Sequence, residues 1–391
     1  MIKRELYMER IRPFIGIDIV KVITGIRRCG KSVMLDLLRD EIDNPHHSIY
    51  LNFESKKNAK LRSADTLYDY IIEKVGNSKR KWYLFLDEIQ EVDSWEKAIN
   101  SFRVDFDADI YITGSNAGLL SGELATLLSG RYVQFVIYPL SYKEFLQLNE
   151  DKGFMDYLKY GGMPFISNII SNNEAVTQYL EDVYNSVVLK DVVKRNNIRD
   201  VDLLDRIITF VLANISQTFS ATSISKYFKS EQRSVSTDTV LNYIRACEDA
   251  YMFYKLKRQN IKGKKILEVS EKYFVADHGL REAVYGKHME DIGMILENII
   301  CLELLRRGYS VTVGTIDGEE IDFIGVKNNE PIYIQVAYLM PDKKTQIREF
   351  GNLNKIGDNY PKYVVTMDEV NMSQNGVKHV NIKDFLLQDW D

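Results

Sequence analysis

Hydrophobic positions in the first 150 residues fall into short, continuously apolar runs, and amphipathic stretches lie between them. Continuous apolar runs indicate strands covered on both faces, and their alternation with amphipathic helices is typical of a parallel α/β sheet. The expected strands are residues 19–24, 48–53, 82–86, 109–113 and 132–137. The expected helices between them are residues 31–41, 64–75 and 94–105. The pattern therefore predicts an α/β domain at residues 1–150.

The pattern beyond residue 150 divides the rest of the chain into three expected segments. Residues 151–200 have helical spacing and are predicted to form a helical lid or linker, interrupted at Gly161-Gly162-Met163-Pro164. Residues 201–265 are predicted to form helices followed by a basic, aromatic strand, and residues 266–391 a second α/β domain. In that domain the expected helices are residues 291–307 and 344–354, and the expected strands are residues 310–313, 321–326, 332–336 and 363–366.

The composition is that of a folded globular protein. Of 391 residues, 45% are hydrophobic and 27% are charged, which excludes a disordered chain, a collagen-like fibre and a disulfide-stapled mini-protein. The net charge of −5 argues against a uniformly basic protein that coats nucleic acid, but it leaves room for a local basic surface. Cys29, Cys247 and Cys301 are far apart and form no CxxC pair, which suits a reducing compartment.

The chain contains no stretch that approaches the ~18–20 apolar residues needed to span a membrane. Its first residues carry charges of both signs and lack the apolar core of a signal peptide. The protein is therefore expected in the cytoplasm, without a membrane partner.

The first expected helix follows a sequence that fits the phosphate-binding pattern G-x-x-x-x-G-K-S. The candidate ATP-binding residues are Gly25, Ile26, Arg27, Arg28, Cys29, Gly30, Lys31 and Ser32. Glycines let several backbone N–H groups face one anion, and the helix N-terminus adds its positive end. We expect Lys31 to contact the β- and γ-phosphates and the Ser32 hydroxyl to bind Mg²⁺. A chance match in a surface turn is the alternative, but the flanking strand and helix disfavour it.

Two acids, Asp87 and Glu88, follow the apolar run at residues 82–86. In P-loop proteins a carboxylate at the end of a neighbouring strand holds Mg²⁺, and a nearby polar group positions the attacking water. Asp87 is therefore the candidate metal residue, acting through water, and Glu88 is the candidate general base. Two acids after a strand can also begin a solvated helix, but the P-loop upstream favours the catalytic interpretation.

Two further positions are candidates for catalysis. The strand at residues 109–113 ends in Gly114-Ser115-Asn116, where Ser115 or Asn116 could hydrogen-bond the attacking water or the γ-phosphate; a plain turn is the alternative. Arg131 is the best candidate for an arginine that stabilises the transition state. It would act from a neighbouring subunit, or else it is an ordinary surface charge. Glu88, Asn116 and Arg131 are thus the expected catalytic residues.

Several segments together resemble a known family. They are Gly25–Ser32, Leu86-Asp-Glu-Ile-Gln90, Ile112-Thr-Gly-Ser-Asn116, the run from Leu119 to Arg131 and Tyr138-Pro-Leu-Ser-Tyr-Lys-Glu-Phe145. They resemble prokaryotic AAA-type ATPases whose C-terminal region is catalogued as a domain of unknown function. The resemblance covers nearly the whole chain and implies a P-loop NTPase core with a parallel sheet of the ASCE, AAA type. It further implies a winged helix-turn-helix module and a restriction-endonuclease-like α/β domain, but no particular substrate.

The middle segment fits a winged helix-turn-helix. Residues 219–228 and 234–250 are expected to form two capped helices, and residues 251–258 a strand and wing. Between residues 224 and 265 there are ten Lys or Arg and four Asp or Glu, a net +6. One interpretation places the second helix in a DNA major groove with basic side chains on phosphates. The alternative is a module for packing or protein docking.

The last segment has part of a metal-dependent nuclease site. The resemblance implies that active enzymes of this kind carry an Asp, then a Glu or Gln one strand later, and a Lys two residues on, which hold Mg²⁺ and stabilise developing charge. Asp322, Gln335 and the helical Glu297 fit the first positions, but Ala337 occupies the lysine position. A degenerate nuclease is therefore expected, with weak metal binding by Glu297 and Asp322 as the alternative.

The expected function is ATP hydrolysis to ADP and phosphate with Mg²⁺, in which the nucleotide state controls the winged-helix and nuclease-like domains. DNA, bound by the basic segment, and a second copy of the chain are the macromolecular partners considered. Two alternatives stay open: a nucleotide-dependent switch that binds protein partners and hydrolyses slowly, and an ATP-coupled nuclease.

Overall fold

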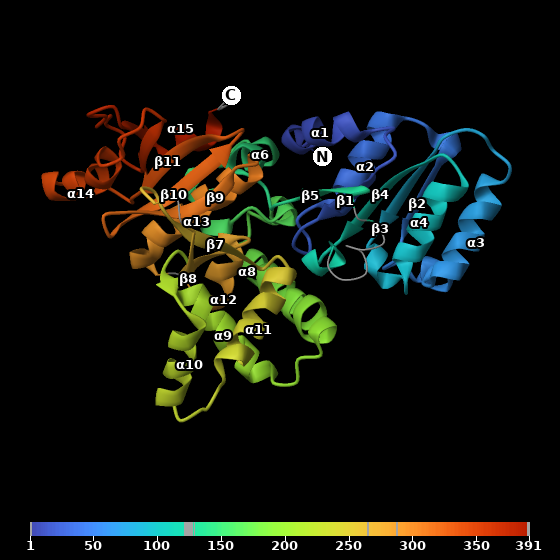
Figure 1. The fold of residues 1–391 in the computed structure, drawn as a ribbon, viewed down its shortest axis with the longest axis horizontal. Coiled ribbons are helices and arrows are strands. Elements are labelled where there is room, and N and C mark those ends of the chain that lie inside the picture. Colours follow the sequence, from blue (N-terminus) through green and yellow to red (C-terminus); the bar gives the residue numbers. More distant parts are fainter. Residues whose placement is uncertain (1, 121–127, 129, 264–265, 287, 389–391) are drawn as a thin grey trace. The chain divides into compact units, whose positions relative to one another are not determined.

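The computed structural model describes residues 2–120, 128, 130–263, 266–286 and 288–388 (Figure 1). The chain forms two compact units. Unit 1 comprises Met1–Tyr138 and Asp249–Tyr251, and unit 2 comprises Pro139–Glu248 and Met252–Asp391. The chain thus leaves unit 1 after Tyr138 and returns to it for three residues.

Unit 1 contains a five-stranded sheet in the order β2-β3-β4-β1-β5, and every neighbouring pair is parallel. Its strands are β1 (Val20–Thr24), β2 (Ser48–Asn52), β3 (Trp82–Asp87), β4 (Ala108–Gly114) and β5 (Tyr132–Val136). The predicted parallel α/β sheet is confirmed, and each expected strand is found to within one residue at either end. Because the strands are parallel, all their carboxyl ends lie at one edge of the sheet.

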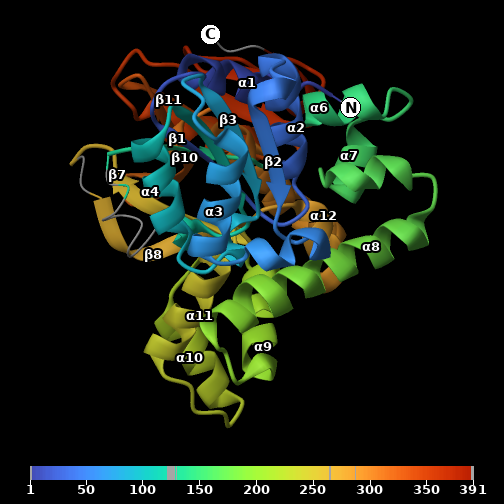
Figure 2. The ribbon, with the colours of Figure 1, turned by 90° about the vertical axis from the view of Figure 1, so that its right-hand side faces the viewer.

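Helices cover this sheet, as Figures 1 and 2 show. The α-helices of unit 1 are α1 (Glu5–Ile11), α2 (Lys31–Ile42), α3 (Ala64–Val75) and α4 (Trp95–Asp105). Its 3-10 helices are Arg12–Phe14, Pro45–His47, Lys56–Leu61, Ile89–Glu91 and Ala117–Leu120. Leu67 of α3 and Phe102 of α4 pack in one apolar core with alternate strand residues such as Val22 and Leu84. The predicted helices at residues 31–41, 64–75 and 94–105 are therefore confirmed.

Unit 2 begins with helices, as the helical spacing predicts. The α-helices described before β7 are α6 (Tyr142–Leu148), α7 (Phe154–Tyr160), α8 (Asn173–Ser186), α9 (Val201–Ala213), α10 (Ala221–Ser230) and α11 (Thr237–Asp249). The 3-10 helix Pro164–Asn168 follows the Gly-Gly-Met-Pro sequence, and the π-helix Val187–Lys194 continues α8. Further along are α12 (His278–Tyr285) and the 3-10 helix Met289–Asp291.

An eight-stranded mixed sheet forms the rest of unit 2, in the order β13-β12-β11-β10-β9-β7-β8-β6. Its strands are β6 (Thr218–Phe219), β7 (Phe253–Asn260), β8 (Ile266–Val275), β9 (Ser310–Ile316), β10 (Glu319–Lys327), β11 (Glu330–Val336), β12 (Lys362–Thr366) and β13 (Lys378–Asn381). Its helices are α13 (Ile292–Arg306), α14 (Lys343–Asn354) and α15 (Ile382–Leu387). The strands β8 and β13 and the helices α12 and α15 were not expected from the sequence.

The boundary expected after residue 265 falls within this sheet. β7 pairs with β8 in an antiparallel hairpin and with β9 in parallel, so strands on both sides of that boundary share one ladder. The boundaries after residues 150, 200 and 265 stay predictions; by compactness alone, the chain divides at Tyr138 and around Asp249–Tyr251.

Asp277 fixes the Gly-Gly-Met-Pro turn in unit 2. Its carboxylate caps α12 by accepting from the Leu280 N–H at 3.1 Å, and it accepts from the Gly162 N–H at 2.6 Å. Gly161 has φ +77°, and a Cβ on Gly162 would lie 2.3 Å from the carbonyl oxygen of Leu140. Both glycines are therefore required by close backbone contact.

We expect Gly162→Ala to lower the stability of unit 2 by about 1–3 kcal/mol or more, because the added methyl group forces the backbone apart. Gly351→Ala is the matched control, since Gly351 lies in α14 with nothing within 4 Å of an added Cβ. That change should stabilise the helix by about 0.5–1 kcal/mol. Calorimetric unfolding measures the melting temperatures of both variants. Equal melting temperatures would contradict the requirement for glycine at position 162.

Candidate nucleotide-binding site

The P-loop connects the carboxyl end of β1 to the start of α2. Gly25 and Gly30 have φ of +144° and +105°, and a Cβ on Gly25 would lie 2.2 Å from the carbonyl oxygen of Ile137. Gly30 is the N-cap of α2 and offers no side-chain cap, so the first N–H groups of the helix have no side chain as partner. A helix start of this kind binds phosphate well.

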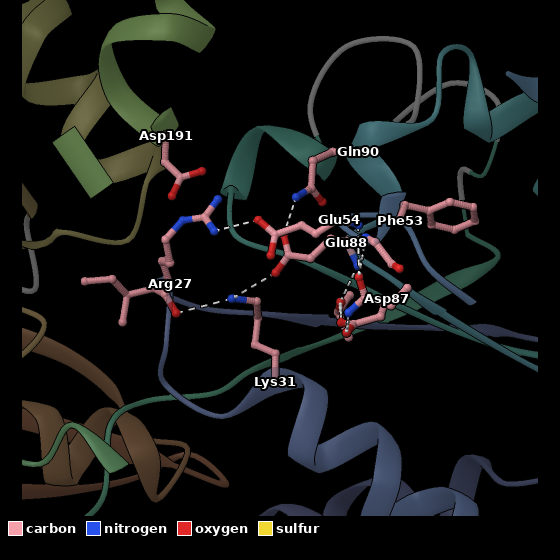
Figure 3. Close-up of polar contacts among 12 residues, drawn as sticks. Arg27, Lys31, Phe53, Glu54, Asp87, Glu88, Gln90 and Asp191 are labelled. Carbon is pink, nitrogen blue, oxygen red and sulfur yellow. Dashed lines mark hydrogen bonds and ion pairs between the residues drawn. The ribbon is translucent and has the colours of Figure 1, made fainter. Parts of the chain in front are cut away.

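Lys31, the first residue of α2, is 4% exposed. Its ammonium group donates to the carbonyl oxygens of Gly25 at 3.2 Å and Ile26 at 3.3 Å. It also lies 3.6 Å from a carboxylate oxygen of Glu88 (Figure 3). The structure therefore brings together the P-loop, its lysine and the candidate general base.

Asp87, the last residue of β3, is fully buried and bonded on both carboxylate oxygens. Its Oδ1 accepts from the hydroxyl of Thr113 at 2.5 Å, and its Oδ2 accepts from the amide of Asn52 at 2.7 Å and from the hydroxyl of Tyr50 at 3.2 Å. Burial, together with Asp87, raises the pKa of Tyr50 to about 12, so that phenol stays a donor. With these donors in place, Asp87 suits indirect metal binding through water.

Glu88 follows in a left-handed conformation with φ +55°, which a non-glycine residue adopts only when its surroundings impose it. Its N–H donates to the Thr113 hydroxyl at 2.8 Å, and its Oε2 accepts from the amide of Gln90. Among the described residues, the Gln90 amide and the more distant Lys31 ammonium group are the partners of its carboxylate, which keeps capacity to accept further hydrogen bonds. The carboxylate faces the Lys31 ammonium group (Figure 3).

Three residues around the acids were missed from the sequence: Thr113, Asn52 and Gln90. Thr113 lies in β4 and Asn52 ends β2, so both reach the same edge of the sheet as Asp87. A polar residue near the carboxyl end of a strand was the signal that could have found Thr113 and Asn52, whereas Gln90 lies in the 3-10 helix after the acids.

The other predicted phosphate-contacting residues lie as follows. Ser115 is fully buried, and Asn116 accepts the Gly118 N–H in a local turn. Arg27, 8% exposed, forms an ion pair with Glu54 at 2.8 Å, and Arg28 is exposed with φ +69°. Ser32 lies in the first turn of α2. The catalytic role of Asn116 stays a prediction, because Thr113 rather than Asn116 contacts the acids.

Arg131 lies at the opposite edge of the sheet. It directly precedes β5, and its carbonyl oxygen accepts from the N–H of Val20 at the start of β1. Since β1 and β5 are parallel, the P-loop lies a strand length away, about 16 Å at ~3.3 Å per residue. At this distance Arg131 does not reach the P-loop of its own chain. The prediction that it stabilises the transition state therefore applies to the P-loop of another copy of the chain. Residues 121–127 and 129 of the run before it lie outside the described residues.

An arginine near the start of the chain supports the P-loop from behind. Arg4, 4% exposed, donates to the carbonyl oxygens of Cys29 at 3.0 Å and Tyr138 at 2.8 Å. Its guanidinium group lies over the ring of Tyr7, whose hydroxyl accepts from the Tyr138 N–H at 3.2 Å. The Cys29 carbonyl thus has a charged donor.

Tyr251 supports the strand that leads into the loop. Its hydroxyl donates to the Thr24 hydroxyl at 2.7 Å and accepts from the Gln134 amide at 2.8 Å. Burial raises its pKa to about 12, so it remains protonated and can donate. Thr24 is the last residue of β1, immediately before Gly25.

Several basic side chains of the segment at residues 224–265 are paired with acids within unit 2. Arg233 contacts Asp200 at 2.8 Å and Asp202 at 2.6 Å, and Lys262 contacts Asp317 at 2.6 Å. These pairs lower the positive charge available for DNA, and DNA binding by this segment stays a prediction.

No α-helix among the described residues is both long and apolar enough to cross a membrane.

Comparison with known proteins agrees with the P-loop geometry. Residues 18–146 match a family model described as AAA domain, which indicates nucleotide binding. Residues 151–291 match one described as Domain of unknown function (DUF8612). Among solved structures, AMPPCP-bound DnaA from Aquifex aeolicus is 14% identical, with a TM-score of 0.32 over 63% of this chain and 88% of that chain. That similarity is too low to carry an argument.

Two relatives extend along most of the chain. An uncharacterized protein of Haemophilus influenzae is 41% identical over 401 residues, which cover 99% of this chain and 99% of the relative. Uncharacterized protein MJ1544 of Methanocaldococcus jannaschii is 31% identical over 361 residues, which cover 85% of this chain and 78% of the relative. The chain therefore belongs to the same family as these two uncharacterized proteins, with an AAA domain at residues 18–146.

Proposed function

We propose that the protein is an ATPase that binds ATP with Mg²⁺ at residues 25–32 and hydrolyses it to ADP and phosphate. One observation carries the proposal: Lys31, Asp87 and Glu88 meet at the edge of the sheet where the P-loop begins (Figure 3). A cation, a carboxylate bonded on both oxygens and a second carboxylate with fewer partners are the groups that phosphoryl transfer to water needs.

Each group has a distinct role. The loop N–H groups and Lys31 bind the phosphates, and the ammonium group exchanges the Gly25 and Ile26 carbonyl oxygens for stronger phosphate acceptors. Ser32 would bind Mg²⁺ directly and Asp87 would bind it through water, and the ion would supply positive charge next to the phosphates. Glu88 accepts a proton from the attacking water, and the Gln90 amide holds its carboxylate in place.

We further propose that the nucleotide state controls unit 2. The support is Tyr251, which bonds the strand end next to the P-loop and is joined along the chain to α11 and β7. A change at Thr24 therefore reaches the segment between those elements. The order α9, β6, α10, α11, β7, β8 supports a winged helix for this part, and the order α13, β9, β10, β11, α14, β12 supports a restriction-endonuclease-like core. DNA and a second copy of the chain stay the proposed macromolecular partners.

Lys31→Ala should weaken ATP binding at least 10–100-fold, since a charge-assisted bond contributes about 1.5–3 kcal/mol. Isothermal titration calorimetry measures the affinity. Lys97→Ala on the exposed side of α4 is the matched control and should bind as the wild type does. Wild-type affinity in Lys31→Ala would remove the P-loop assignment.

Glu88→Gln should bind ATP but hydrolyse it about 10²–10⁴ times more slowly, because the amide preserves the shape and cannot accept the proton. Phosphate release under multiple turnover measures the rate, with Glu91→Gln on the following 3-10 helix as control. Turnover near the wild-type rate would show that another group activates the water.

Arg4→Met should reduce ATP affinity about tenfold, because it leaves the Cys29 carbonyl without its donor and loosens the loop. Arg12→Met is the control: the Arg12 side chain is partly exposed and pairs with Glu5 and Glu41, away from the Cys29 carbonyl, so its loss should leave the ATP affinity unchanged. Arg4→Lys should recover part of the affinity. Equal affinity in the Arg4 and Arg12 variants would contradict a positioning role for Arg4.

A further inference from the structure

A buried lysine lies among three carboxylates in unit 2. The ammonium nitrogen of Lys272, on β8, is 2.6 Å from Glu320 Oε1, 3.3 Å from Glu297 Oε2 and 3.9 Å from Asp322 Oδ1. Lys272 is only 3% exposed. The acids come from α13 and β10, so the lysine joins three separate elements of the unit.

Electrostatics explain why the lysine is charged there. Burial alone would lower the pKa of Lys272, but Glu297, Asp322 and Glu320 outweigh it and raise the pKa above its ordinary value. Burial, followed by repulsion from Asp322, raises the pKa of Glu297. Burial also raises the pKa of Asp322, to about 6, against the attraction of Lys272. Burial thus disfavours the charged forms of Glu297 and Asp322, and the Lys272 ammonium group lies near both of them and near Glu320.

The acids include two that the sequence suggested for weak metal binding, Glu297 and Asp322. One oxygen of Asp322 accepts the N–H of Val336 at 2.8 Å, and its other oxygen faces Lys272. Position 337, where a lysine is expected, is occupied by Ala337, but the ammonium group of Lys272 on β8, an earlier strand of the chain, reaches the same acids. Sequence reasoning missed it because β8 was not expected as a strand of this sheet.

We propose that Lys272 is the resident cation of this carboxylate cluster, in the place where clusters of carboxylates otherwise hold a divalent metal ion. The ammonium group lies between the carboxylate oxygens, partly neutralises their negative charge and repels any further cation. The sheet of unit 2 is therefore held together at this point without metal, and it is closed to the metal that a nuclease would need. Removal of the lysine uncovers a latent site for a divalent cation.

The test is Mn²⁺ binding to the full-length chain without nucleotide, measured from the loss of the electron paramagnetic resonance signal of free Mn²⁺. Wild type and Asp322→Asn should bind equally, because the cluster takes no metal in either. Lys272→Met should gain about one Mn²⁺ per chain, and Lys272→Met with Asp322→Asn should lose it again. Any Mn²⁺ held in unit 1 is common to all variants and cancels.

Lys255→Met is the matched control. Lys255 lies on the neighbouring strand β7 and also faces two carboxylates, Glu248 at 3.7 Å and Glu271 at 3.8 Å, but it is exposed. Its removal should create no Mn²⁺ site. Lys272→Met should also melt several degrees lower than wild type and regain part of that loss with Mn²⁺.

Three results would overturn the proposal: wild-type binding that falls by one Mn²⁺ in Asp322→Asn, no gain in a folded Lys272→Met, or plasmid cleavage with Mg²⁺ or Mn²⁺ that is lost in Asp322→Asn. If Lys272→Met does not fold, the comparison of wild type with Asp322→Asn decides alone. Equal binding there supports the lysine as the resident cation, and unequal binding refutes it.

Discussion

A loop that turns its N–H groups toward an anion must turn carbonyl oxygens elsewhere, and the structure of unit 1 around the P-loop follows from the need to give those oxygens donors. Lys31 bonds the Gly25 and Ile26 carbonyls, and Arg4 bonds the carbonyl of Cys29. The two donors differ in kind. Lys31 is attached to the loop and can leave its carbonyls for phosphate, whereas Arg4 comes from before α1 and also holds Tyr138. The Cys29 carbonyl is therefore held by a donor from outside the loop, whereas the Gly25 and Ile26 carbonyls are held by a donor that phosphate can attract away.

Asp87 and Glu88 are both bonded to one side chain, that of Thr113. The Thr113 hydroxyl donates to Asp87 and accepts from the N–H of Glu88, so a single side chain on β4 aligns both. Asp87 has its oxygens filled by donors, while Glu88 retains acceptor capacity beside Lys31. Glu88 adopts a strained, positive φ, and this conformation accompanies the placement of two consecutive carboxylates in different surroundings: that of Asp87 among donors and that of Glu88 beside Lys31.

Much of unit 1 could be predicted from the sequence because its signals are local. Apolar runs marked the strands, and the phosphate-binding pattern marked the loop at residues 25–32. Even the distance of Arg131 from the loop was contained in the sequence, since residues before a parallel strand lie opposite those that follow one. The contact of Arg4 with Tyr138 and that of Tyr251 with Thr24 could not be predicted, because each joins positions more than a hundred residues apart that no periodicity relates.

Unit 2 was predicted less well for the same reason. Its strands at residues 310–336 were recognised one by one, but the parallel pairing of β7 with β9 that makes one sheet of eight strands is non-local. A domain boundary was consequently expected after residue 265, between the two strands β7 and β8 of one hairpin. The position of Lys272 among the acids depends on that pairing, so the sequence suggested acids without a lysine, whereas in the structure the Lys272 ammonium group lies beside those acids.

The return of Asp249–Tyr251 to unit 1 has a consequence for how this protein can evolve. A gene fragment that ended after Tyr138 would encode the whole parallel sheet yet leave the Thr24 hydroxyl and the Gln134 amide without Tyr251. Unit 1 is thus not encoded by one continuous segment of the gene, because Asp249–Tyr251 lie in the sequence between two segments of unit 2. Recombination that shuffles intact domains would separate the two, so the units are expected to pass from ancestor to descendant as one piece.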